Sequence, residues 1–462
     1  MMDKNLKTAI IDKYISPTRQ ERERRIGIEI ELPVVRLDGS AVQESAVVNA
    51  AAAFGERFSF EPVSRDSDGN VYSMLKTETG DDLSFDCSFT NLELSLGTGS
   101  DLFEIKARFE TYFMALNDLL SESGHMLTGM GINPGYKTNA NRPVPNERYL
   151  MLDRFLKKAA EYKTSSDGRL LHGRNDFGYF TSASQVQLDV GYDELTDVLN
   201  VFGRLEPYKV LLFANSFCDE LPQLLCARNY LWENSMQGYD PHNVGMFDTG
   251  FESVDDVAEY IASQSMYSVM RGSKWLDFEP LKLTDYFAAE SIEAEYFDGS
   301  VIRQTVIKPD ISDLKYHRTF KFEDLTFRGT VEFRSGCTQP VRDSMTIAAF
   351  HTGLIERLSE LKELLYTDRV IYHHGYRAAE LQRMFSGREL PGFVDKALLT
   401  AQLKKILDIS TAGLKARGHG EDTLLAPLYE RAQKLESPAG RMLAALENGE
   451  SLCAYIEEYG RL

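Results

Sequence analysis

Residues 26–32 read IGIEIEL, an alternation of apolar and polar side chains that predicts a β-strand. Successive side chains of a strand point to opposite faces of a sheet. The residues at 26, 28, 30 and 32 therefore share an apolar face, whereas Glu29 and Glu31 share the opposite one. We expect the first face to pack on a core and the second to stay open.

Three more segments repeat this pattern: NLELSL at 91–96, QVQLDV at 185–190 and TVEFR at 330–334. Each has one apolar and one polar face, as strands do when an antiparallel sheet is buried on one side. Their polar faces carry Glu93, Gln185, Gln187, Asp189, Glu332 and Arg334. The segments together predict a large antiparallel sheet in an α+β protein.

A polar strand face often does no more than contact water, and that interpretation fits any one of these segments alone. These faces, however, carry carboxylates and carboxamides rather than the Lys, Thr and mixed charge usual on a wet strand. Alternate residues stand roughly 7 Å apart along a strand, so Glu29 and Glu31 would repel neighbouring carboxylates unless cations lay between them. Oxygen ligands favour Mg²⁺, with Mn²⁺ as a substitute, and Mg²⁺ between carboxylates and phosphates is typical of ATP chemistry.

The rest of the sequence argues against several other functions. A net charge of −19 disfavours nucleic-acid binding, which needs clustered Lys and Arg. No GxxxxGK[ST] loop, no GxGxxG opening a helix and no kinase HRD or DFG motif is present. An ATP site in this chain is therefore not a P-loop.

The N-terminus and the cysteines indicate the compartment. The first 15 residues intersperse charges among apolar residues, unlike a signal peptide: Asp3, Lys4, Lys7, Asp12 and Lys13. No apolar run approaches the roughly 20 residues that cross a bilayer. The five cysteines are scattered without CxxC or zinc-site spacing. We expect a cytoplasmic protein with free thiols, several of them buried, and no membrane contact.

Helical periodicity is clearest at 102–121, 192–213, 254–268 and 344–365. It continues through most of 397–462, with Ser437-Pro438 as a helix start, and His373-His374 is expected in a loop. No repeat or Pro/Gly/Ser linker divides the chain. We therefore predict one catalytic domain over residues 1–462, with 397–462 as a helical C-terminal cap.

Taken in order, the four strand segments resemble the glutamate-cysteine ligase family, and its plant and bacterial branch most closely. Members carry a Gly-x-Glu-x-Glu strand, matched by GIEIE at 27–31, then an acidic residue and a later Glu, matched by Asp86 and Glu93. A Gln-Val-x-Leu-Asp strand is matched at 185–189, and a Glu-x-Arg sequence at 332–334. Connecting segments are also similar, so the resemblance covers the chain from about residue 20 to its end.

The resemblance implies a large antiparallel sheet, curved into a half-barrel or funnel and wrapped by helices, related to glutamine synthetase and the guanidino kinases. ATP and glutamate would meet on its concave face over about two or three Mg²⁺. The implied activity joins the γ-carboxylate of glutamate to the amine of cysteine through γ-glutamyl phosphate. Its products are γ-glutamylcysteine, ADP and phosphate, as in the first step of glutathione synthesis.

The resemblance also implies roles for individual residues. The implied metal ligands are Glu29, Glu31, Asp86, Glu93, Gln185 and Glu332. The implied catalytic residues are Glu332 and Arg334, whose guanidinium stays charged and can face the transferred phosphate. The implied substrate-binding residues are Arg228, Arg148 and Gln187. Arg228 would hold a carboxylate of the amino acid, and a structural arginine stacked on aromatic neighbours is the alternative for it.

Departures from the family pattern concern the second substrate. Relatives carry a basic residue near position 326, where this chain has Thr326 with Arg328 close by, and the Arg of an Arg-x-Gly stretch is missing from DPHNVG at 240–245. A γ-glutamyl ligase for another amine in specialised metabolism is therefore the first alternative. A catalytically silent binding protein on the same scaffold is the second.

Overall fold

A nine-stranded antiparallel sheet lies at the centre of the molecule, for which the computed structural model describes residues 4–462. Its strand order is β14-β15-β7-β1-β5-β4-β3-β2, and β6 pairs with β1 off this path. The strands are β1 Ile26–Val35, β2 Glu61–Arg65, β3 Val71–Lys76, β4 Asp81–Phe85, β5 Asn91–Gly99, β6 Met126–Leu127, β7 Ser184–Asp189, β14 Glu323–Leu325 and β15 Thr330–Phe333. The predicted large antiparallel sheet is confirmed.

The four segments singled out in the sequence are neighbours in this sheet, in the order β15, β7, β1 and β5. Their apolar residues are buried as predicted, and Ile26, Ile28 and Ile30 are each at most 2% exposed. Burial of one face in every central strand fixes the register, because a slip of one residue would turn the apolar side chains to the open face.

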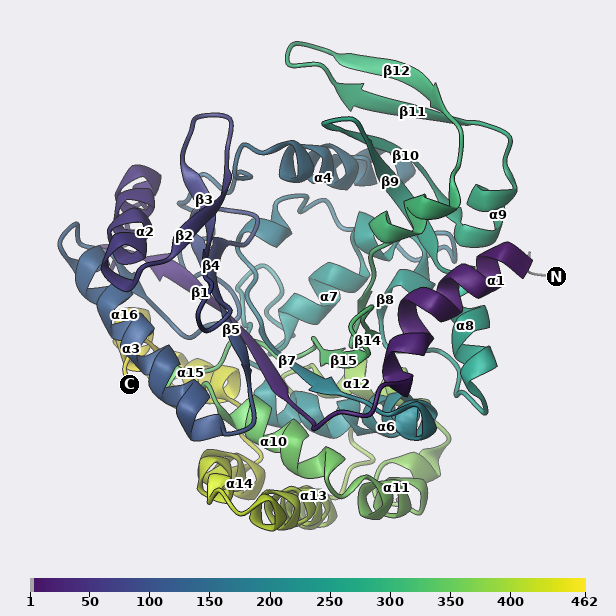
Figure 1. Cartoon of the computed structure of the whole chain (residues 1–462). Helices are drawn as coiled ribbons and strands as arrows, with labels where there is room; N and C mark the ends of the chain where they lie inside the picture. The colour runs from purple at the N-terminus through teal and green to yellow at the C-terminus, as the bar shows by residue number, and fades with distance from the viewer. Residues whose placement is uncertain (1–3) are drawn as a thin grey trace.

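Sixteen α-helices surround the sheet in the described chain. The first eight are α1 Lys4–Ile10, α2 Glu44–Phe58, α3 Leu102–Ser121, α4 Glu147–Lys157, α5 Ala159–Tyr162, α6 Leu195–Phe213, α7 Ala227–Glu233 and α8 Val254–Ser263. The others are α9 Leu283–Ala288, α10 Thr346–Ile355, α11 Leu358–Tyr366, α12 Ala378–Phe385, α13 Lys396–Arg417, α14 Ala426–Lys434, α15 Pro438–Glu447 and α16 Leu452–Tyr459. Helices α3 and α10 pack on the apolar face of the sheet, and α13 packs on the far side of α10 (Figure 1).

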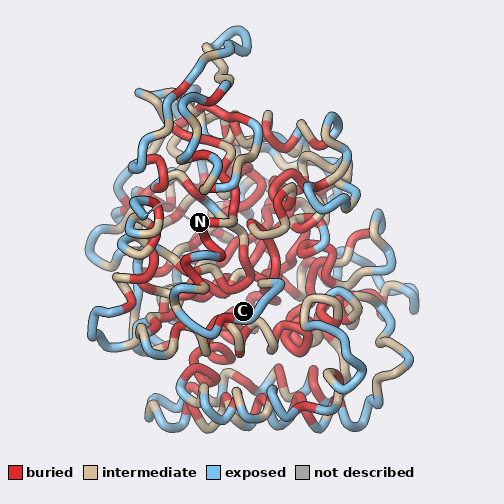
Figure 2. The backbone as a smooth tube through the Cα atoms, turned by 90° about the vertical axis from the view of Figure 1, so that its right-hand side faces the viewer, coloured by how far each residue is buried: buried red, intermediate tan, exposed pale blue. Residues whose placement is uncertain are grey.

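Smaller sheets complete the fold. Strands β9 Ser265–Arg271, β10 Lys274–Lys282, β11 Ile292–Phe297 and β12 Ile302–Ile307 form an antiparallel sheet of four strands. The β11–β12 hairpin projects from the body, and its backbone is largely exposed or intermediate, in contrast to the buried centre (Figure 2). Strands β8 Val244–Gly245 and β13 Phe320–Lys321 pair in parallel.

The helix predictions hold in part. Helix α3 has the predicted bounds, and α15 starts at Pro438 after the N-cap Ser437, whose hydroxyl accepts from the Gly440 amide. The predicted helix 192–213 begins as a 3₁₀ turn before α6, and 344–365 is divided into α10 and α11.

Two local predictions are wrong. The predicted helix 254–268 ends at Ser263, because 265–271 pairs with β10 as strand β9, so tertiary pairing overrides the helical periodicity. His373 and His374 lie in a 3₁₀ turn rather than a loop, which brings their rings to 3.7 Å between centroids.

All five cysteines are free thiols, and four of them are buried, as predicted. Cys226 and Cys337 share a thiol–thiol hydrogen bond of 3.7 Å between sulfur atoms and form no disulfide. No helix within residues 4–462 combines the length and the apolarity that crossing a membrane requires.

Candidate functional site

The register of the central strands places the polar residues on one face. Glu31 lies opposite Glu93, and Glu29 lies opposite Gln185 of β7. Gln187 in turn lies opposite Glu332 of β15. Directly opposed residues of antiparallel strands point to the same side of a sheet. The pairing therefore gathers side chains from four strands on the face away from α3 and α10.

This face forms one wall of a cavity of about 470 Å³. Other lining residues come from helices α4 and α7, from residues 317–320 and from an N-terminal segment that includes Lys13 and Tyr14 (Figure 1). Nine residues named from the sequence line it: Glu29, Glu31, Asp86, Glu93, Arg148, Arg228, Gln185, Glu332 and Arg334. The tenth, Gln187, does not line the cavity and instead bonds two residues that do.

Glu31, Asp86 and Glu93 form the tightest group of carboxylates. Each offers one oxygen, and these oxygens all lie within 4.8 Å of one another. Asp86 follows β4 in a turn where Cys87 adopts φ 60°, a left-handed conformation that is rare for a non-glycine residue.

Burial and mutual repulsion act on these three acids together. Burial, with Asp86 close by, raises the pKa of Glu31 to about 8. Burial, with Asp86 and Glu31 close by, raises the pKa of Glu93 to about 8. Such a set favours a hard divalent cation, because all donors are oxygens and the cation relieves the repulsion. The donor chemistry therefore fits Mg²⁺.

Gln185 adds a further oxygen. Its amide nitrogen donates to Glu31 Oε1 at 3.0 Å, and the Ala183 amide donates to Glu31 Oε2 at 2.7 Å. The side-chain oxygen of Gln185 is buried without a hydrogen-bond partner among the described residues, although Gln185 lines the cavity. A buried acceptor of this kind is expected to have a partner, such as a water molecule or a cation.

Glu29 and Glu332 form a second group. Gln187 Nε2 donates to Glu29 Oε1 at 2.8 Å and to Glu332 Oε1 at 2.7 Å, so the carboxamide joins two like-charged residues. Burial and the carboxylates of Glu332 and Glu93 raise the pKa of Glu29 well above its usual value. Arg328 donates to Gln187 Oε1 at 2.6 Å. Arg328 is the basic residue that the sequence places close to Thr326.

Arg334 follows β15 and forms an ion pair with Glu332. Burial opposes its charge, but Glu332, Asp324 and Glu29 outweigh burial and raise the pKa of Arg334. Its guanidinium is therefore a permanent cation among carboxylates.

The two other arginines named from the sequence line the cavity from helices α7 and α4. Arg228 is 7% exposed, donates to the Arg334 carbonyl at 3.1 Å and lies 6.0 Å from the Trp232 ring centre. Its Nε is buried without a partner among the described residues. The side chain of Arg148, on α4, makes no hydrogen bond or ion pair to the chain from residue 4 onward.

The sequence reasoning missed several residues that line the cavity. They are Lys13, Tyr14, Ser84, Cys87, Tyr149, Leu152, Trp232, His317, Arg318, Thr319, Phe320, Asp324, Leu325 and Phe327. Asp324 lies opposite Glu332 in the sheet, but EDL at 323–325 lacks the apolar–polar alternation of the longer strands that would have indicated it. Nothing in the local pattern singles out Lys13 or Arg318.

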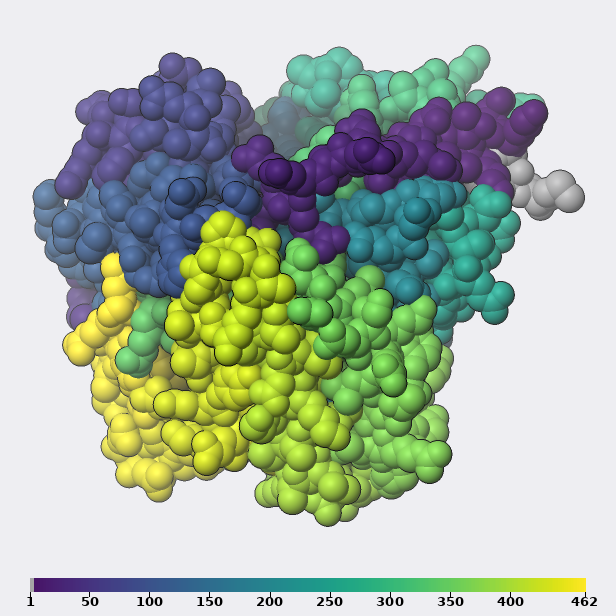
Figure 3. Space-filling view, turned by 60° about the horizontal axis from the view of Figure 1, so that its bottom comes forward, coloured from purple at the N-terminus to yellow at the C-terminus, as the bar shows by residue number. Residues whose placement is uncertain are grey.

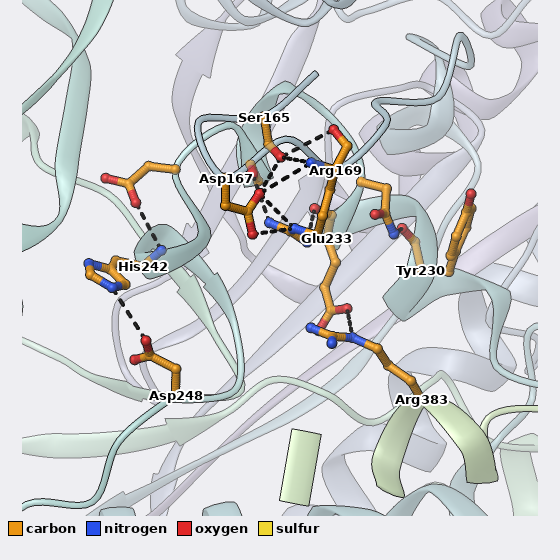
Figure 4. A network of polar contacts seen from close by, with 11 residues as sticks. Ser165, Asp167, Arg169, Tyr230, Glu233, His242, Asp248 and Arg383 are labelled. Carbon is orange, nitrogen blue, oxygen red and sulfur yellow. Dashed lines mark hydrogen bonds and ion pairs between the residues drawn. The ribbon is translucent and has the colours of Figure 1, made fainter. Parts of the chain in front are cut away.

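Two other cavities contain arginines that are paired with carboxylates of the protein. One of about 400 Å³ beside α6 and α7 contains Arg169 bound to Asp167, Arg383 bound to Glu233, and His242 within 3.5 Å of Asp248 (Figure 4). Another of about 570 Å³, at the C-terminal helices, contains Arg431 paired with Asp343. Volume therefore does not identify the site, whereas clustered carboxylates and unpaired cations do.

Comparisons with known proteins concern the family and the fold of the chain. The sequence model described as glutamate-cysteine ligase family 2 matches residues 25–454. No curated protein matches the chain. Among solved structures, the glutamate–cysteine ligase of Francisella tularensis in complex with AMP has a TM-score of 0.50 at 10% identity, over 96% of this chain and 88% of that one. At this identity the similarity shows the fold alone.

Two other solved structures are more distant. The bifunctional glutathione synthetase of Pasteurella multocida has a TM-score of 0.40 at 12% identity, over 100% of this chain and 54% of that one. A complex of GmaS with ADP has a TM-score of 0.31 at 9% identity, over 97% of this chain and 75% of that one.

Proposed function

The chain belongs to glutamate-cysteine ligase family 2, and on that premise we propose that it joins the γ-carboxylate of glutamate to the amine of cysteine at the expense of ATP. The observation that carries the proposal is the cavity wall where Glu31, Asp86 and Glu93 meet beside Glu332 and Arg334. Carboxylates for cations next to an arginine for phosphate are the parts that phosphoryl transfer requires.

The proposal also includes the shape of the sheet, the domain organisation and the cellular location. We propose that the polar face is the concave side of a funnel and that the chain forms one catalytic domain, with 397–462 as its helical cap. We also propose that the enzyme works in the cytoplasm, in the first step of glutathione synthesis. The family match supports the single domain, since residues 25–454 include the sheet and most of the cap.

Two groups of residues would hold the divalent cations. Glu31, Asp86, Glu93 and the free oxygen of Gln185 are one set, and Glu29 and Glu332 are the other. When bound, Mg²⁺ would neutralise charge on the phosphates and on the reacting carboxylate. Gln187 fixes the distance between Glu29 and Glu332 and is a positioning residue.

In the first half-reaction, an oxygen of the glutamate γ-carboxylate attacks the γ-phosphorus of ATP, and the bond to the bridging oxygen of ADP breaks. Arg334 stabilises the charge on the transferred group, because its guanidinium is fixed by Glu332 before the reaction starts. Arg228 holds the α-carboxylate of glutamate, because it lines the cavity and forms no ion pair with the described residues.

In the second half-reaction, the amine nitrogen attacks the γ-carbonyl carbon and a C–N bond forms. Phosphate leaves with the electron pair of the C–O bond, and the nitrogen gives up a proton to the departing phosphate or to water. No covalent bond to the protein is required. The acyl phosphate would lie between the sheet, α4, α7 and the N-terminal segment, whose residues line the cavity.

The role of Arg228 gives a first prediction. We expect Arg228→Ala to raise the KM for glutamate by about 10-fold or more and to leave the KM for ATP largely unchanged, because one charged hydrogen-bond donor is lost. Arg383→Ala is the matched control, since Arg383 also bonds a carboxylate in the neighbouring cavity. Loss of ATP affinity with an unchanged glutamate KM would instead assign Arg228 to the nucleotide.

The amine is tested by phosphate release from MgATP and glutamate across a panel of amines. If cysteine is the acceptor, packing and a weak S–H contact recognise its thiol. 2-Aminobutyrate should therefore also react, with a penalty of about 1 to 3 kcal/mol, or roughly 10- to 200-fold in kcat/KM. Another active amine, with these two inert, would favour the alternative γ-glutamyl ligase. An absence of MgATP binding at millimolar concentration would favour the silent binding protein.

A further inference from the structure

The N-terminal segment of the protein lies outside the stretch that the family model matches, which begins at residue 25. It consists of α1, a π-helical turn Ile11–Ile15 and a 3₁₀ turn Ser16–Arg19. Tyr14 and Ile15 belong to the main core, so the segment is firmly packed. It runs along one side of the molecule against α8 and residues 311–316 (Figures 1 and 3).

The π turn of this segment delivers Lys13 to the cavity. Lys13 Nζ donates to the Leu314 carbonyl at 2.6 Å and to the Tyr14 hydroxyl at 2.8 Å. Tyr14 in turn bonds Nδ1 of the buried His317 at 2.9 Å, which holds the phenol in place. Both partners of Lys13 are neutral, so no carboxylate of the described chain neutralises this lysine through an ion pair.

Arg318 lies beside Lys13 in the same cavity wall. It makes no hydrogen bond or ion pair with any residue from 4 to 462. Burial, with Arg318 close by, lowers the pKa of Lys13 to about 7, against the opposing effect of Asp324. Burial, with Arg148 close by, also lowers the pKa of Arg318.

The charged or titratable groups that face Lys13 are Tyr14, His317, Arg318 and Asp324. Two cations held together without an ion-pair partner repel each other, and an anionic ligand relieves that repulsion. Arg169 and Arg383 of the neighbouring cavity are already neutralised by carboxylates of the protein, so they do not call for an anionic ligand.

We propose that Lys13 and Arg318 bind the phosphate groups of the nucleotide, so that a segment outside the family match completes the ATP site. The proposal rests on the proposed function. The position of the two residues favours the phosphates over the amino-acid carboxylate. Asp324 acts on Lys13 and lies opposite Glu332 in the sheet. Glu332 in turn pairs with Arg334, the residue assigned to the transferred phosphate. Two adjacent cations also suit an anion that carries several charges.

Binding of the Mg²⁺ complex of a non-hydrolysable ATP analogue, measured by calorimetry, tests the proposal. We expect Lys13→Met to weaken binding by about 10-fold or more, and Arg318→Met to do the same, since each removes a charge-assisted contact. Lys13→Arg should retain most of the affinity. Lys7→Met is the control on the same segment, because Lys7 pairs with Asp255 outside the cavity. Thermal melting of each variant checks that the segment stays packed.

The pH dependence separates a phosphate-binding lysine from a structural one. Lys13 must be protonated to bind phosphate, so affinity should be greatest below pH 7 and fall as pH rises above it. Lys13→Arg should lose this fall, because an arginine stays charged. Comparison of the wild-type protein with Lys13→Arg also removes the effect of nucleotide protonation, which is the same for both proteins.

The outcomes distinguish the two proposals. Unchanged nucleotide affinity in Lys13→Met, with wild-type protein that binds MgATP, would overturn the role of Lys13 and leave the proposed function standing. A rise in the glutamate KM alone would likewise place Lys13 in the carboxylate site and overturn the role. Wild-type protein that fails to bind MgATP would overturn the proposed function, and the role of Lys13 with it.

Discussion

Replacing Glu93 with glutamine lowers kcat by more than about 100-fold and leaves the fold intact, if the carboxylates bind the catalytic cations. Glu93 offers an oxygen within 4.8 Å of those of Glu31 and Asp86, and a glutamine there keeps the shape but loses the charge. The neighbouring Leu92 and Leu94 are buried on the opposite face and are not disturbed. Glu29→Gln should behave in the same way in the second group.

The measurement is steady-state turnover together with thermal melting, with and without Mg²⁺. Mg²⁺ should raise the Tm of the wild-type protein, because it binds the folded state, and should raise that of Glu93→Gln much less. Asp82→Asn is the matched control: Asp82 lies opposite Ser95 on the same face of the sheet but does not line the cavity. Near-normal turnover in both Glu93→Gln and Glu29→Gln would contradict the metal assignment.

Replacing Gly413 with valine destabilises the protein by about 3 kcal/mol or more, or prevents folding. Gly413 of α13 faces Gly353 of α10, and a Cβ on Gly413 would lie 1.9 Å from the Gly353 carbonyl oxygen. A Cβ on Gly353 would lie 2.2 Å from the Ser410 carbonyl oxygen, so the two helix backbones are in direct contact. Neither backbone can yield to a side chain without separation of the helices.

That separation matters because α10 is the layer between α13 and the sheet. Leu354 and Leu414, both 0% exposed, would lose their packing. Urea unfolding gives the free-energy difference, and Gly392→Ala is the control, since nothing lies within 4 Å of a Cβ there. A Gly413→Val protein as stable as Gly392→Ala would show that the helices can move apart without loss.

Local pattern was sufficient for the strands and insufficient for some helix ends. The alternation at 26–32 predicts β1 because a period of two depends only on which side chains are buried. At 264–268 the helical spacing of apolar residues gave a wrong prediction. The segment forms backbone hydrogen bonds with β10, and no feature of the local sequence indicates that pairing. Arg228 was found through the resemblance rather than through pattern.

The sequence by itself determined the chemistry of the sheet face: it supplied carboxylates, carboxamides and one arginine in alternation with apolar residues, and the motifs that identify the family. The tertiary structure alone decided which of these residues meet. It brings Asp86 to Glu31, uses Gln187 to join Glu29 to Glu332, and adds Lys13 from the N-terminus. The reason is physical: side-chain alternation is a property of neighbours along the chain, whereas contact between residues far apart in sequence is fixed by strand register and by the packing of buried faces.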